Sequence, residues 1–185
     1  MATGRWSGIR AKLETDYLAP SLRGRIQYFA TSYSKCPDHE GRAAVRLDGI
    51  EILKSSYYER WMSEAGAACE AMCRQQGLSA TKRYKAVNQA VLDGGDFDQI
   101  DFYEAFREFD NQSITVSLNS RNPIVRLFAL LDRRVGKRKL TALKNTMEEE
   151  LSWLSMFYHI RLEAEGMEGP VQGKGSYPGT ESIWL

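Results

Sequence analysis

The chain has 185 residues, of which 43% are hydrophobic and 26% charged, as in a soluble folded domain. Its 25 basic and 24 acidic side chains give a net charge of +1. This balance excludes a protein that coats nucleic acid with an overall basic surface, and it excludes a strongly acidic mimic protein. It says nothing of local charged patches. The sequence holds no apolar run of about 18 residues, so we expect no membrane span. The first six residues, MATGRW, lead into an amphipathic segment rather than a signal peptide, and we expect a cytoplasmic protein.

The chain has three cysteines, an odd number, and their spacing is not that of a disulfide-stabilised domain. We therefore expect no disulfide scaffold. Cys69 and Cys73 are four residues apart, which on a helix places both thiols on one face, where cysteine usually fills apolar space. Cys36 lies in a turn-rich stretch. A zinc site would need further ligands, and His39 and His159 are the only histidines. We expect no metal and no cofactor.

The first third predicts one helix followed by a three-stranded antiparallel meander. Residues 6–17 repeat apolar side chains at helical spacing. The Asp48-Gly49 pair separates two apolar-alternating runs and predicts a type I′ hairpin turn, because glycine accepts a positive φ. The predicted strands are 25–34, 42–47 and 50–53. One face of such a sheet must be covered.

The remaining two-thirds predict helices that supply this cover. The predicted helices are 57–76, 80–92, 98–109, 123–135 and 138–165. Residues 113–118 alternate like a strand, yet Ser113 is able to cap a short helix, which we favour. Asn122 as N-cap and Pro123 at the first helical position open the helix that follows.

Apolar stripes assign several large side chains of these helices to the core. The inward side chains of the helices between 57 and 109 include Tyr58, Trp61, Met62, Met72, Tyr84 and Ile100. The stripe of 138–165 marks a central core helix, although a partner-binding coiled coil would have the same seam. His159 beside it is expected to be partly buried. We therefore predict an α+β fold, with a single domain over 1–166 and a flexible Gly/Pro-rich tail over 167–185.

The near-zero total charge divides into two opposed blocks. Residues 119–139 carry seven basic side chains and one acidic, a net charge of +6, whereas residues 93–110 carry seven acidic and one basic, a net charge of −6. Arg133, Arg134, Lys137 and Arg138 in the first block form a candidate site for an anion or a macromolecular partner, because a guanidinium group binds phosphate through two parallel hydrogen bonds. Alternatively, the two blocks pair inside the fold or remain solvated. Nucleic acid is not favoured, because no aromatic residues interleave the charges.

A second candidate is the loop Asp38-His39-Glu40-Gly41-Arg42. A histidine flanked by carboxylates and an arginine suits acid-base or metal chemistry, since histidine titrates near neutral pH. A solvated turn explains the same residues. The sequence has no Walker loop, no Rossmann glycine fingerprint and no Gly-x-Ser-x-Gly elbow.

Three segments carry a resemblance: LRGRIQYFATSY at 22–33, HEGRAAVRLDG at 39–49 and NPIVRLFALLDRRVGKRKL at 122–140. Together they resemble an uncharacterised family of small bacterial proteins across residues 5–165. The resemblance implies a bacterial cytoplasmic protein and no particular activity. The family-like positions among the candidates are Glu40, Gly41, Arg42, Asp132, Arg133, Arg134, Gly136, Lys137 and Arg138. In structural terms, Asp132 would bridge Arg42 or another cation, and Gly136 would allow a turn of positive φ.

Three functions follow from these features. The first is a non-catalytic protein that binds or regulates a macromolecular partner through the basic residues. The second is a small enzyme that uses Asp38, His39, Glu40 and Arg42. The third is an accessory or immunity-type protein that acts through the acidic surface of residues 93–110. We favour the first, with a protein or an anionic partner.

Overall fold

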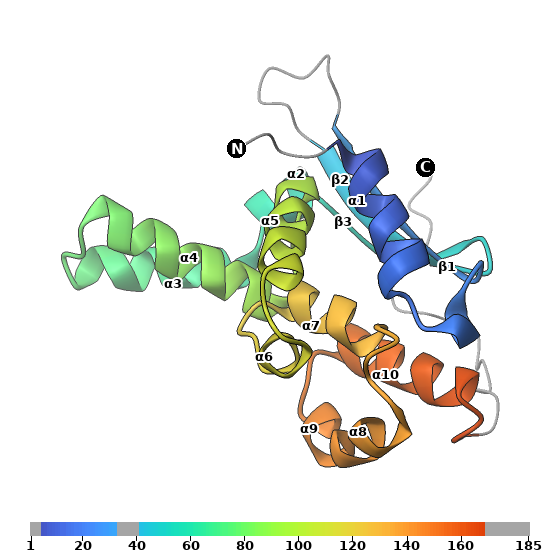
Figure 1. The fold of residues 1–185 in the computed structure, drawn as a ribbon. Helices are drawn as coiled ribbons and strands as arrows, with labels where there is room; N and C mark the ends of the chain where they lie inside the picture. The colour runs from blue at the N-terminus through green and yellow to red at the C-terminus, as the bar shows by residue number, and fades with distance from the viewer. Residues whose placement is uncertain (1–4, 33–40, 169–185) are drawn as a thin grey trace, which may run out of the picture.

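The computed structural model describes residues 5–32 and 41–168 and confirms the α+β architecture (Figure 1). The sheet is antiparallel in the order β1-β2-β3, with a bulge between Val45 and Arg46. Its strands are β1 (Ile26–Ser32), β2 (Gly41–Leu47) and β3 (Ile50–Ser56). Asp48 and Gly49 have φ values of 51° and 87°, which confirms the hairpin turn with positive φ at both positions.

The N-terminal helix covers one face of the sheet. α1 (Trp6–Ala11) continues into a π-helical segment, η1 (Lys12–Tyr17), and a short 3-10 turn, η2 (Pro20–Leu22), follows. Ile9 and Leu13 are buried, and the Glu14 carboxylate accepts a hydrogen bond of 2.8 Å from the Tyr28 amide on β1. The helix predicted over 6–17 is therefore present, with a wider turn in its second half.

Helices α5 (Gln99–Asp110) and α7 (Pro123–Leu130) supply the centre of the core. The Phe128 ring lies between 5.5 and 5.9 Å from the rings of Tyr28, Phe102 and Phe109. α7 begins as predicted, because the Asn122 side chain accepts a hydrogen bond from the Ile124 amide. It ends at Leu130, earlier than predicted. The segment of residues 113–118 is helical, as α6 (Ile114–Leu118).

The helix predicted over 57–76 is interrupted. α2 (Tyr57–Trp61) and α3 (Glu64–Gln75) are separate helices, because the Ser63 hydroxyl caps a new helix by accepting from the Gly66 amide. α4 (Ala80–Gly94) packs against α3, and Figure 1 shows this pair projecting from the rest of the molecule. We call α3 and α4 the arm.

The prediction that the apolar stripes of this region face the core is confirmed for Phe102, Phe106 and Phe109 and is wrong for six other large side chains. The exposed side chains are Tyr58, Trp61, Met62, Met72, Tyr84 and Ile100. In the arm, α3 and α4 meet through small residues: a Cβ at Gly66 would lie 2.7 Å from the Val91 side chain. The larger residues of each stripe therefore fall outside the contact. Cys73 is buried with its sulfur 3.9 Å from that of Cys69, so both thiols share one face as predicted.

The single helix predicted over 138–165 is three helices: α8 (Lys137–Ala142), α9 (Lys144–Glu148) and α10 (Ser152–Ala164). Leu151 has extended backbone angles, with φ −50° and ψ 134°, and this conformation ends helical hydrogen bonding before α10. The Tyr158 hydroxyl of α10 then donates to the Leu140 carbonyl of α8. His159 is exposed and its Nδ1 lies 2.8 Å from Glu168, so its predicted burial is wrong.

None of the helices in the part of the chain that the structure describes is long and apolar enough to cross a membrane.

Candidate binding surface

Residues 131–136 form a fixed loop between α7 and α8. The Ala19 amide donates to the Leu131 carbonyl at 2.9 Å, and the Arg133 amide donates to the Tyr17 carbonyl at 2.7 Å. These two hydrogen bonds form a short antiparallel bridge between the loop and the end of η1. The loop is therefore held by backbone contacts at its start, independently of its charged side chains. Gly136 has φ −81°, so the predicted positive φ is wrong.

Asp132 anchors the same loop from inside. Its fully buried carboxylate accepts a hydrogen bond of 2.6 Å from the Arg134 amide and further bonds of 2.7 to 3.0 Å from the Arg134 guanidinium. These bonds raise the pKa of Arg134. Of the cations that the sequence left open for Asp132, the partner is Arg134; Arg42 instead binds Glu51 on β3.

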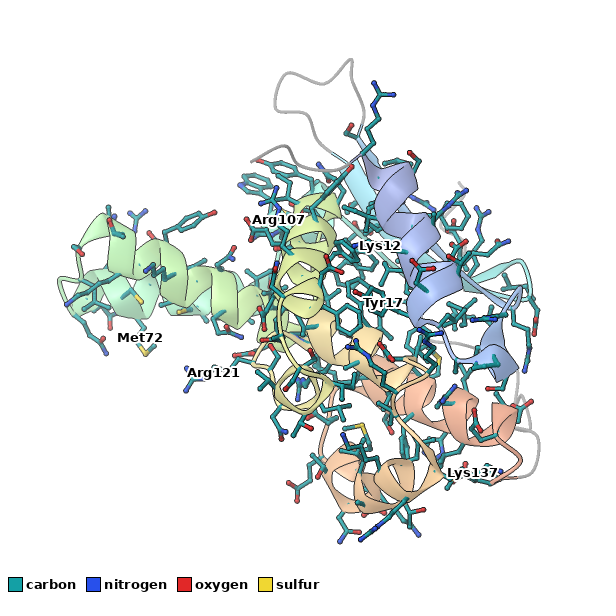
Figure 2. All side chains as sticks on the ribbon, in the orientation of Figure 1. Lys12, Tyr17, Met72, Arg107, Arg121 and Lys137 are labelled. Atoms are coloured by element: carbon teal, nitrogen blue, oxygen red, sulfur yellow. The ribbon has the colours of Figure 1, made fainter. Side chains whose placement is uncertain are left out.

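Arg134 also covers two aromatic rings. Its guanidinium lies 5.0 Å from the Tyr17 ring centre and 5.4 Å from that of Phe109. The Tyr17 hydroxyl donates to Asp110, which also lies 3.3 Å from the Lys12 ammonium. Burial, together with the bond to Asp110, raises the pKa of Tyr17 to about 12. Figure 2 shows Lys12 and Tyr17 on the side of the N-terminal helix that faces α5. Arg134 is thus a structural residue.

The other cations of the candidate site face solvent. Arg133, Lys137 and Arg138 are exposed, and within residues 5–32 and 41–168 none of the three forms an ion pair. Lys139 is also exposed, with its ammonium 3.2 Å from the Thr115 hydroxyl. Figure 2 shows Lys137 at the edge of the molecule. We call Arg133, Lys137 and Arg138 the basic corner.

The two charge blocks do not neutralise each other through ion pairs in the described part of the chain. Within the basic block, Arg126 pairs with Glu150 of the loop after α9, and Arg134 pairs with Asp132. Within the acidic block, Asp110 pairs with Lys12. Tyr17 links charged residues of the two blocks, because it touches both Arg134 and Asp110.

One charged network was not predicted from the sequence. The Arg60 Nε of α2 lies 2.9 Å from Asp101 and 3.7 Å from Asp98, and its guanidinium also donates to the Asn88 side chain of α4. Burial raises the pKa of Asp98, and nearby Asp101 adds to this effect. The Asp98–Asp101 capping box at the start of α5 is recognisable from its three-residue spacing. No local signal indicates Arg60, which comes from a distant helix.

The second candidate site falls mainly on residues that the structure does not describe. Asp38, His39 and Glu40 lie outside the described residues, as does Cys36. Arg42 is described, and its guanidinium binds Glu51 within the sheet. Among residues 5–32 and 41–168, no three His, Cys, Asp or Glu side chains are grouped to hold a metal ion.

Comparison with known proteins yields one match. The model of the SF0329 protein family matches residues 5–162, a range that includes the sheet, the arm and the basic corner. No curated protein and no solved structure matches the chain.

Proposed function

We propose that this chain, which belongs to the SF0329 protein family, is a bacterial cytoplasmic, non-catalytic protein that binds an acidic segment of a partner protein. The observation that supports this is the basic corner: three exposed cations that form no ion pair with any described residue, on a loop that Asp132 fixes from beneath and on the helix that follows it. Because the backbone that carries these cations is already fixed, only their side chains lose conformational entropy when they bind carboxylates, which favours binding.

An acidic protein segment fits this surface better than a single-stranded nucleic acid does. Binding of single strands uses aromatic rings on which bases stack. The aromatic rings next to the corner, Tyr17 and Phe109, lie beneath the Arg134 guanidinium. The corner therefore offers charge without an open stacking platform.

The test measures binding of a fluorescent peptide of alternating Glu and Asp by anisotropy, with duplex DNA of equal charge as competitor. The variant Arg133→Ala/Lys137→Ala/Arg138→Ala removes three contacts worth about 0.5 kcal/mol each, so we expect affinity to fall about tenfold. The matched control, Arg5→Ala/Lys54→Ala/Arg107→Ala, removes three exposed cations elsewhere and should bind as wild type does.

Two results would overturn the proposal. Equal binding by the wild type and the corner variant would show that the corner is not the contact surface. DNA binding that is tighter than peptide binding, and that the corner variant loses, would replace the acidic protein by a nucleic acid.

A further inference from the structure

The arm and the neighbouring helices α2 and α5 expose large apolar side chains. Tyr84 on α4 is 72% exposed, and Trp61 and Tyr58 on α2 are 71% and 65% exposed. Ile100 on α5 is also exposed. Single exposed apolar residues are common on protein surfaces, whereas a contiguous group of them marks an interaction surface.

These side chains come from the three helices that Arg60 links. Its guanidinium joins three helices, because it contacts Asn88 of α4 and Asp101 of α5 from its own position on α2. Trp61 follows Arg60 directly, and Tyr84 lies one helical turn before Asn88. Ile100 precedes Asp101. The Arg60 network thus links the three helices that carry these exposed apolar side chains. We call the four residues the patch: Tyr58, Trp61, Tyr84 and Ile100.

The arm is also polarised in charge along its length. Its tip, residues 74–85, carries four basic side chains and no acidic one. The stretch from the end of α4 into α5, residues 93–104, carries five acidic side chains and no basic one. We call the second stretch the root. Figure 1 places the tip at the far end of the arm and the root against the body.

Part of this charge is already neutralised, and the remainder is exposed. At the tip, Glu70 pairs with Arg74 and Arg83. In the part of the chain that the structure describes, Lys82 and Lys85 form no ion pair and are exposed.

At the root, Arg60 pairs with Asp98 and Asp101. The other root acids form no ion pair with any residue that the structure describes, and Asp93 and Glu104 are exposed. The tip therefore keeps positive charge and the root keeps negative charge.

We infer that the arm docks antiparallel against the arm of a second copy of this chain. In a two-fold pair each surface meets itself, so one chain must carry both complementary parts. The arm does: an antiparallel pairing sets the basic tip of each copy on the acidic root of the other and buries the patch between them. A parallel pairing would place like charges together.

The test uses charge reversal in both directions and sedimentation velocity on the full chain. The tip variant is Lys82→Glu/Lys85→Glu, and the root variant is Asp93→Lys/Glu104→Lys. The changes at 82 and 93 suit the macrodipole of α4, because they place an acid in its first turn and a cation in its last. The control variant, Lys54→Glu/Lys144→Glu, reverses two exposed lysines outside the arm.

We expect the wild type and the control to form a dimer at about 100 µM. Each arm variant alone should raise the dissociation constant of the dimer about 100-fold. The two reversed side chains occur in both copies, so four contacts become repulsive, and each of them weakens binding about threefold. An equimolar mixture of tip and root variants should form a heterodimer, since every reversed contact is then attractive again.

An independent variant tests the apolar part. Trp61→Ser/Tyr84→Ser leaves the charges unchanged and should also yield monomers, with circular dichroism confirming the native helix content. The inference is overturned if the wild type is monomeric at this concentration, if either arm variant or the serine variant still forms the wild-type dimer, or if the mixture remains monomeric.

Discussion

Replacing Asp132 should destabilise the protein by a predictable amount, because its carboxylate makes two separable kinds of contact. It accepts a hydrogen bond of 2.6 Å from the Arg134 amide, and it pairs with the Arg134 guanidinium. Asp132→Ala removes both contacts. Asp132→Asn retains an oxygen that is able to accept from the amide and removes the charge.

The magnitude follows from burial. Asp132 is fully buried, so Asp132→Ala leaves a polar amide without a partner, at a cost of about 2 kcal/mol. The Arg134 side chain is 39% exposed, so solvent screens the ion pair and its loss costs about 1 kcal/mol more. We expect the free energy of unfolding to fall by about 3 kcal/mol in Asp132→Ala and about 1 kcal/mol in Asp132→Asn.

Thermal denaturation followed by circular dichroism measures the effect. For a chain of this size, about 3 °C of Tm corresponds to 1 kcal/mol, so the two variants should melt about 9 °C and 3 °C below the wild type. Arg133→Ala is the control, because this exposed side chain forms no ion pair with a residue in the described ranges. A Tm for Asp132→Ala within about 2 °C of the wild type would refute the assignment of Asp132 as the anchor of the loop.

Two further predictions concern η1 and the sheet. The pKa of Tyr17 is raised to about 12, so its protonated hydroxyl stabilises the fold fully below pH 10 and ceases to do so as the pH rises towards 12. Tyr17→Phe should therefore reduce the loss of Tm above pH 10. An unchanged dependence of Tm on pH in this variant would contradict the prediction. A Cβ at Gly41 would lie 2.1 Å from the Thr31 carbonyl oxygen, so Gly41→Ala should lower the Tm by more than about 6 °C. Gly8→Ala in α1, where a Cβ meets no atom within 4 Å, should leave the Tm unchanged or raise it slightly.

The features predicted correctly from the sequence are those that neighbouring residues decide. The Asp48-Gly49 turn depends on the positive φ that glycine accepts, and the start of α7 depends on the Asn122 side chain and the ring of Pro123. In both cases the decisive contacts lie within three residues. The order of helix, meander and helices follows from such signals.

The errors arise where distant contacts decide. Helical spacing in α3 and α4 identifies an apolar stripe, but the surface that packs against the stripe decides which part of it is buried. Here each of the two helices packs against the other through small residues. The break before α10 occurs at Leu151, a residue that carries no glycine or proline signal. The Arg60 network joins α2, α4 and α5, so no single stretch of sequence contains it.

The charge blocks show how the same limit applies to the candidate site. Spacing alone indicates that cations and carboxylates are concentrated, and it leaves open which of them pair. In the structure, the buried carboxylates of the two blocks are paired: Asp132 with Arg134, and Asp98 and Asp101 with Arg60. An uncompensated buried charge costs more than an exposed one, so folding leaves the unpaired charges at the surface. The basic corner and the root of the arm are therefore the parts of the two blocks that keep unpaired charge at the surface, and a net charge of +1 conceals both.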